Sequence, residues 1–130
     1  YDPTCNKVLL VQSRGMKWGP PKGTMESTDK SIENCALREV YEETGIQLSK
    51  NDLKKSIKFD RTTFYILPYS STDITFPSYD DDNDVSGISW ITVECLDRMV
   101  ENNKLALNSP CKKLIARLKS SKNANDTLFQ

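Results

Sequence analysis

The chain has 130 residues, of which 28% are charged and 37% hydrophobic, and this composition predicts a single globular domain. Eighteen basic and eighteen acidic side chains cancel, so no overall charge attracts a polyanion, and any nucleic-acid affinity must come from a local patch. Histidine is absent, which excludes catalytic triads built on imidazole and zinc sites with histidine ligands.

The four cysteines, at positions 5, 35, 95 and 111, are widely spaced and form no C-x-x-C pair. This spacing favours reduced thiols in an intracellular protein, and we expect a cytoplasmic location. No apolar run approaches the roughly 20 residues of a membrane span, and no signal peptide is visible, so no membrane partner is expected.

Residues 7–12 (KVLLVQ) form a short apolar run typical of a buried strand. A loop follows at 17–23 (KWGPPKG), which Pro20 and Pro21 hold in an extended geometry. Trp18 in this loop has two interpretations of similar weight: a hydrophobic plug under the sheet, or a surface on which a substrate stacks.

Residues 31–44 are predicted to form a helix, because Ile32, Ala36 and Val40 recur at helical spacing and give it an apolar stripe. Serine, threonine and aspartate residues at 27–31 supply candidate N-caps, and Gly45 is a candidate C-cap.

Three carboxylates, Glu39, Glu42 and Glu43, share one face of this helix. Like charges at this spacing repel by about 0.2–0.5 kcal/mol per pair, and the C-terminal end of a helix disfavours acids. Arg38 can offset part of the repulsion through Glu42, four residues on. A divalent cation would offset more, and an all-oxygen ligand set suits Mg²⁺ or Mn²⁺. The alternative is a solvated acidic face without a ligand.

The second half of the chain predicts further strands and two helices. A hairpin is expected from 56–59 and 62–69, another strand at 73–79, an acidic run at 80–84 and a strand at 88–91. Helices are expected at 94–101 and from about 109, the latter with a core stripe at positions 111, 114, 115 and 118.

Residues 38–46 (REVYEETGI) fill every position of the second half of the Nudix box, G-x5-E-x7-R-E-U-x-E-E-x-G-U with U aliphatic, and the chain therefore resembles the Nudix hydrolase family. One departure concerns Gly23, which lies one residue further from Arg38 than the pattern has it. In the family the first glutamate of the box supports the arginine. Asp29 is the residue expected to do so here.

The resemblance implies an α/β/α sandwich with a mixed sheet, whose first strand would precede Tyr1. Residues 1–119 would form the Nudix domain and 120–130 a polar tail. It also implies that Mg²⁺ or Mn²⁺ is held by Glu39, Glu42 and Glu43, together with the backbone carbonyl of Lys22. Such enzymes hydrolyse a phosphoanhydride linked to a nucleoside diphosphate. Without histidine, the general base must be a carboxylate.

Two carboxylates are candidates for that base. Glu42 belongs to the box, and Asp84 precedes an Ile-x-Trp strand in a stretch that resembles decapping relatives. The alternative for the acidic run at 80–84 is a solvated loop.

The substrate prediction rests on 18–23 (WGPPKG) and 35–45 (CALREVYEETG), which resemble mRNA-decapping Nudix enzymes most. Capped RNA is then the substrate and 7-methyl-GDP a product, with an activator protein or a flanking domain as further partners. The substrate-binding candidates are Lys22, Trp18, Arg38, Lys112 and Lys113. The alternative for the last two is an ordinary lysine-rich helix face exposed to solvent.

Alternative assignments are diadenosine tetraphosphate hydrolase, diphosphoinositol polyphosphate phosphohydrolase, and a Nudix-like module that binds nucleotide without turnover.

Overall fold

The computed structural model describes residues 1–13, 17–71, 85–102, 107 and 109–120. The elements in chain order are β1 (Lys7–Ser13), β2 (Trp18–Gly19), α1 (Ile32–Thr44), the 3₁₀ turn η1 (Lys50–Asp52), β3 (Ser56–Phe59), β4 (Thr62–Tyr65), β5 (Val85–Thr92), α2 (Val93–Glu101) and α3 (Ser109–Ser120). The strand predicted at 73–79, the acidic run with Asp84, and the tail from residue 121 lie outside the described residues.

Strand β1 lies at the centre of a sheet with the order β2-β1-β5, and its pairing with both neighbours is antiparallel. Leu10 and Val11 point to opposite faces of the strand, and both are buried, so the sheet is covered on both sides. The second sheet is the predicted hairpin, β3 and β4. The mixed sheet expected from the sequence requires parallel pairing as well. Within the described part of the chain, the parallel pairing consists of a single bridge between Trp18 and Leu107.

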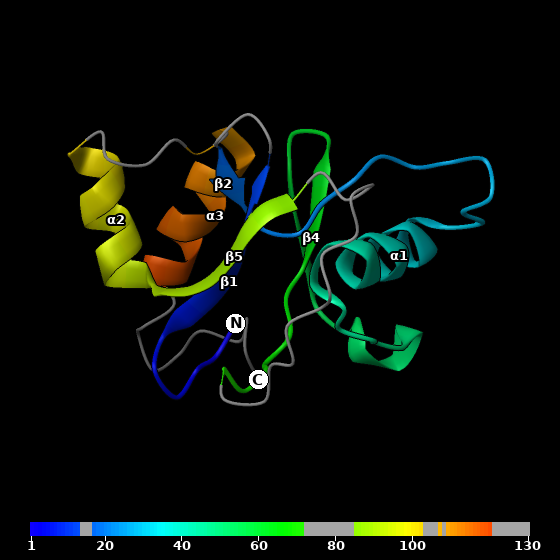
Figure 1. The fold of residues 1–130 in the computed structure, drawn as a ribbon, viewed down its shortest axis with the longest axis horizontal. Coiled ribbons are helices and arrows are strands. Elements are labelled where there is room, and N and C mark those ends of the chain that lie inside the picture. Colours follow the sequence, from blue (N-terminus) through cyan, green and yellow to red (C-terminus); the bar gives the residue numbers. More distant parts are fainter. Residues whose placement is uncertain (14–16, 72–84, 103–106, 108, 121–130) are drawn as a thin grey trace.

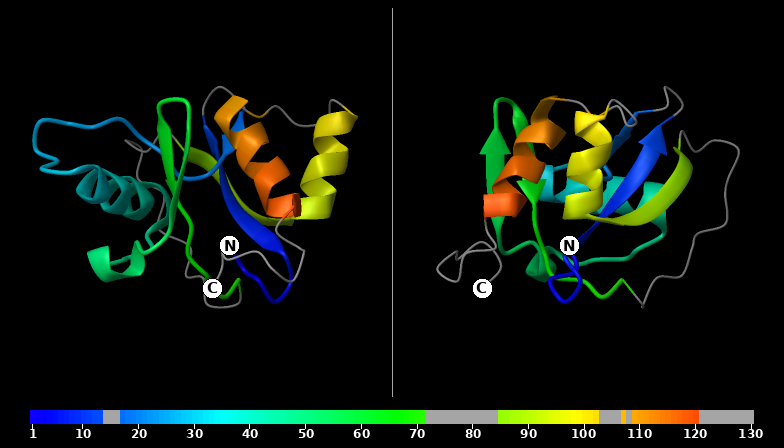
Figure 2. Two further views of the ribbon diagram at one scale, coloured as in Figure 1. Left: turned by 180° about the vertical axis from the view of Figure 1, so that it is seen from behind. Right: turned by 90° about the vertical axis from the view of Figure 1, so that its left-hand side faces the viewer.

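The helices form two layers with the strands between them (Figure 1). Helices α2 and α3 pack together on one side, and α1 lies on the other, an arrangement that both views in Figure 2 repeat. The stripe predicted for α3 faces the core, where Cys111, Leu114, Ile115 and Leu118 are all buried. The α/β/α arrangement is confirmed.

Helix α1 ends at the predicted residue, and it begins one residue later than predicted, after the candidate N-cap Ser31. The Ser31 hydroxyl accepts the Asn34 N–H (3.1 Å), which caps the first turn. Gly45 adopts the left-handed conformation with φ 75°, and its N–H bonds the Tyr41 carbonyl (2.8 Å). The apolar stripe is covered unevenly, because Ile32 remains 49% exposed at the first turn of the helix.

None of the helices in the described residues is long and apolar enough to cross a membrane. No disulfide joins the four cysteines, all of which lie in the described part of the chain. Cys35 of α1 is buried.

The left-handed conformation of Gly45 yields a stability prediction. Gly45→Ala should lower the free energy of unfolding by about 1–2 kcal/mol, because a Cβ is disfavoured at this φ. Gly45→Asn is the matched control and should cost less, since asparagine tolerates this conformation. Urea unfolding of both variants measures the difference, and equal losses would contradict a backbone origin.

Candidate functional site

The loop after β2 lies along the carboxylate face of α1. The backbone N–H of Lys22 donates to Glu43 Oε2 (3.2 Å), which places the Lys22 main chain beside this acid. Gly23 lies against Glu39 so closely that a Cβ there would be 1.9 Å from Glu39 Cδ. A side chain at position 23 would therefore require the Glu39 carboxylate to move from its present place.

Arg38 ties the same loop to the helix through Asp29. Its Nε and Nη2 donate to the two Asp29 carboxylate oxygens (2.9 and 2.8 Å), and Nη2 also reaches the Thr24 carbonyl (3.3 Å). The Asp29 side chain is only 5% exposed. Hydrogen bonds from Arg38 and from the Glu26 N–H lower the pKa of Asp29 to about 2. The prediction that Asp29 supports Arg38 is confirmed.

The remaining nitrogen of Arg38 contacts further acids. Nη1 lies 2.9 Å from Glu39 Oε1 and 3.2 Å from Glu42 Oε2, the second being the predicted pair four residues apart. Glu26 of the loop is 3.5 Å away. One guanidinium therefore offsets the charge of several carboxylates that would otherwise repel one another.

Glu43 is the carboxylate that Arg38 does not contact in the described structure. Its pKa is raised to about 7, chiefly by burial and also by the charges of Glu39 and Glu42, while the N–H and the charge of Lys22 oppose the shift. Burial also raises the pKa of Glu39, against the effect of Arg38. Both acids therefore lack a full counter-charge, and this is the electrostatic condition that a bound cation would relieve.

The predicted substrate-binding residues occupy different parts of the structure. Trp18 is half-buried and packs against the core, and its Cη2 would lie only 3.2 Å from a Cβ placed on Gly87. This packing supports the interpretation of Trp18 as a hydrophobic plug. Lys112 and Lys113 are exposed on α3, across the strands from α1 (Figure 1), and Lys113 pairs with Asp60 (2.9 Å). Asp84 lies outside the described residues.

Comparison with known proteins decides the family. The pattern of the family described as the NUDIX domain matches residues 1–114. The chain belongs to the Nudix hydrolase family. The Nudix α/β fold predicted from the box is thereby confirmed.

Several curated relatives of this Nudix chain are similar in sequence. A protein of Invertebrate iridescent virus 3 named "Putative hydrolase 111R" is 36% identical over 110 residues, which are 82% of this chain and 65% of the relative. The mRNA decapping complex subunit 2 of Schizosaccharomyces pombe is 36% identical over 98 residues, 68% of this chain and 13% of the relative. The mRNA-decapping enzyme subunit 2 of Arabidopsis thaliana is 35% identical over 96 residues, 68% of this chain and 25% of the relative.

The chain therefore spans less than two thirds of the length of each of these relatives. Among solved structures, a C. elegans Ap4A hydrolase binary complex matches with a TM-score of 0.56. That match covers 88% of this chain and 85% of the other at 16% identity, which is a likeness of fold.

The Nudix carboxylates fit a hard divalent cation in their chemistry. Glu39, Glu42 and Glu43 offer oxygen ligands on one helix face, beside the Lys22 backbone. As the side chains stand, no three acidic, cysteine or histidine residues in the described ranges converge enough to hold an ion. A cation using all of them would need at least one carboxylate to turn, and the Glu42 side chain, at 53%, is far more exposed than that of Glu39, at 16%.

Glu26 is absent from the site predicted from sequence. It lies in the loop three residues before Asp29, and its N–H donates to Asp29 Oδ2 (2.9 Å) while its carboxylate approaches Arg38. The three-residue spacing between Glu26 and Asp29 is the sequence signal for this contact, because an aspartate side chain commonly bonds backbone groups within the same turn.

The Asp29–Arg38 pair yields a pH prediction. The folded pKa of Asp29, about 2, lies below the unfolded value of about 3.9, so the ionised carboxylate stabilises the fold at pH values above about 4. This contribution is lost as pH falls through about 2. Asp29→Asn should therefore lower stability near neutral pH, and its deficit relative to wild type should shrink in acid.

Thermal unfolding of wild type and Asp29→Asn across this pH range measures the deficit. Glu26→Gln is the matched control, because the Glu26 side chain is 61% exposed and should contribute much less. A deficit that stays constant down to the lowest pH would show that the lost carboxylate charge is not its cause.

Proposed function

We propose that this Nudix hydrolase cleaves a phosphoanhydride bond in a substrate linked to a nucleoside diphosphate, namely the 5′ cap of mRNA, releasing 7-methyl-GDP. The observation that carries the proposal is the docking of the Lys22–Gly23 backbone onto the carboxylate face of α1, next to Glu39 and Glu43. This arrangement supports the proposal because acidic side chains and loop backbone groups lie together there, as a cation and a polyphosphate would require.

The substrate part of the proposal is supported by sequence. The loop at 18–23 and the helix at 35–45 carry the features that resemble decapping enzymes, and two similar relatives are named as mRNA-decapping subunits. Because those relatives are much longer than this chain, an activator protein or a flanking domain belongs to the proposal too. A cytoplasmic location fits the absence of disulfides between the four cysteines.

Each residue of the proposed site has a stated role. Glu39, Glu42, Glu43 and the Lys22 carbonyl would hold Mg²⁺ or Mn²⁺, which when bound neutralises substrate phosphates and makes water a better nucleophile. Arg38 keeps Glu39 and Glu42 on the loop side of the helix. Either Glu42 or Asp84 would accept the proton of the attacking water. Lys22 and Arg38 would add positive charge near the phosphates.

Glu43→Gln tests the carboxylate face. The folded pKa of Glu43, about 7, lies above the unfolded value of about 4.3, so ionised Glu43 destabilises the fold at pH values above about 7. At about pH 8 the variant should be more stable than wild type, by on the order of 2 kcal/mol, and the gain should vanish below about pH 4.

The same variant should lose Mg²⁺-dependent turnover by about 100-fold or more. Chemical unfolding and steady-state hydrolysis measure the two effects. The matched control is Glu101→Gln, an exposed acid at the end of α2, which should change neither. A folded Glu43→Gln enzyme with wild-type turnover would dismiss the cation role of this face.

A parallel substrate assay tests the assignment to capped RNA. Cap-labelled RNA, diadenosine tetraphosphate and a diphosphoinositol polyphosphate are each incubated with the protein and Mg²⁺ or Mn²⁺. We expect labelled 7-methyl-GDP from the first and slower turnover of the other two. Preferred turnover of either small substrate would reassign the enzyme within the family, and binding of nucleotide without any turnover would identify a non-catalytic module.

A further inference from the structure

A groove of about 490 Å³ lies between α2 and α3, the two helices that pack together across the strands from α1 (Figure 2). Its apolar lining comes from three segments: Val100 of α2, Leu107 just before α3, and Ile115 and Ala116 of α3. Leu107 and Ile115 are buried and belong to the core, whereas Ala116 is exposed. The core therefore reaches the surface here, beside a small side chain that lets another segment come close to α3.

Charged side chains flank this groove unequally. Lys119 forms an ion pair with Asp97 of α2 (2.7 Å), and both residues line the groove. Lys112 lines it seven residues earlier, about 10 Å away along α3. Lys112 is exposed, and the ion pairs among the described residues do not involve it. Its neighbour Lys113 is outside the groove lining and pairs with Asp60 of the hairpin (2.9 Å). Lys112 therefore offers a charge that the described part of the chain does not compensate.

The size of the groove indicates what kind of partner fits it. Eight residues line it, whereas a standard interface between two folded proteins involves about 20–30 residues on each side. A second copy of this chain would need a much larger surface, so a short segment fits better. A helix suits a groove between two helices, because its side chains at i, i+3, i+4 and i+7 follow about two turns of its neighbour.

We propose that the groove between α2 and α3 binds a short amphipathic helix of a partner protein, in which acidic side chains flank an apolar stripe. The stripe covers Val100, Leu107 and Ile115 and comes closest to α3 at Ala116. An acid at one end of the stripe pairs with Lys112. The inference goes beyond the proposed function, because the groove lies across the strands from the carboxylate face and no step of hydrolysis uses it.

Peptide binding tests the proposal without any substrate. The probe is a fluorescein-labelled peptide of about 12 residues, with leucines at i, i+3, i+4 and i+7 and glutamates at the flanking positions. Its anisotropy is titrated with the 130-residue chain. A second peptide with lysine in place of each glutamate is the control for charge. We expect saturable binding of the acidic peptide, and binding of the basic peptide weaker by about fivefold or more.

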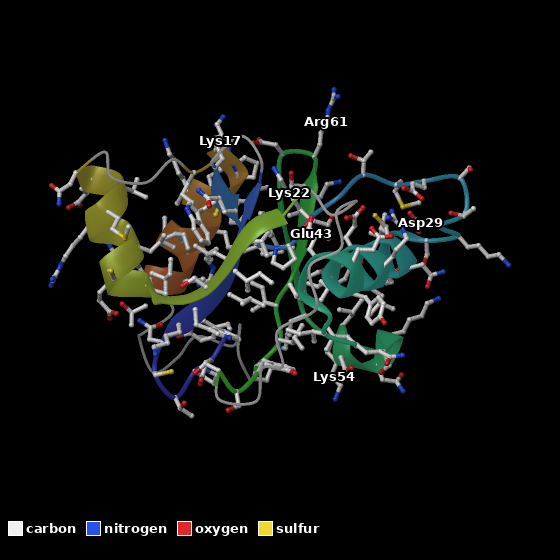
Figure 3. The ribbon with its side chains drawn as sticks, in the orientation of Figure 1. Lys17, Lys22, Asp29, Glu43, Lys54 and Arg61 are labelled. Carbon is white, nitrogen blue, oxygen red and sulfur yellow. The ribbon has the colours of Figure 1, made fainter. Side chains whose placement is uncertain are left out.

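Variants of the protein then locate the site. Lys112→Gln should weaken binding of the acidic peptide about two- to fivefold, and Asp97→Asn should strengthen it by a similar factor because it frees Lys119. Ala116→Trp should weaken binding about tenfold or more, because the indole fills the groove from an exposed position. Lys54→Gln is the matched control. It removes the same charge across the strands from α2 and α3 (Figure 3) and should leave binding unchanged.

Thermal unfolding checks that each variant is folded. Opposite effects of Lys112→Gln and Asp97→Asn support the proposal, since a general loss of structure would weaken binding in both. Equal effects of Lys112→Gln and Lys54→Gln, equal binding of the two peptides, or no saturation below about 1 mM would overturn it.

Two competitors exclude other occupants of the groove. Displacement of the peptide by a single-stranded RNA of the same net charge would show that the groove attracts any anion. Displacement with similar affinity by a synthetic peptide of residues 121–130 would assign the groove to this chain itself. Either result would overturn the assignment to a partner helix, whereas resistance to both competitors supports it.

Discussion

The guanidinium of Arg38 is the contact on which the proposed site depends. On one side it forms a bidentate pair with Asp29 of the loop, and on the other it lies between Glu39 and Glu42 of its own helix. Removing it would leave a nearly buried aspartate without its charge partner and two neighbouring glutamates in mutual repulsion. Loop position and carboxylate geometry are therefore set by one side chain.

This contact also explains how the site accepts an extra residue between Gly23 and Arg38. The family pattern places a glutamate six residues after the glycine, and here Asp29 stands at that spacing and pairs with Arg38. The turn formed by Glu26 to Asp29 brings the shorter side chain to the guanidinium, and Ser31 then starts the helix. The insertion is absorbed before the helix, so the spacing from Arg38 to Glu43 is unaffected.

Much of this structure could be predicted from local sequence signals. Ser31 and Gly45 set the ends of α1 because their side chain and backbone chemistry act locally, and the buried stripe of α3 follows from spacing alone. Spacing could not show that Ile32 stays exposed, because exposure depends on what other segments cover. It also could not show that Trp18 packs on the core, which depends on the distant Gly87 and Leu107.

The structure divides the charges of the carboxylate face in a way that spacing along the helix did not predict. The sequence shows three glutamates and one arginine on this face of the helix. In the structure Glu39 and Glu42 both contact Arg38, whereas Glu43 accepts a hydrogen bond from the backbone amide of Lys22. That amide belongs to Lys22, whose side chain is exposed and whose charge also lowers the pKa of Glu43. A change of the Lys22 side chain leaves its N–H in place and removes only the charge, so the two effects of Lys22 on Glu43 are physically separable at this one residue.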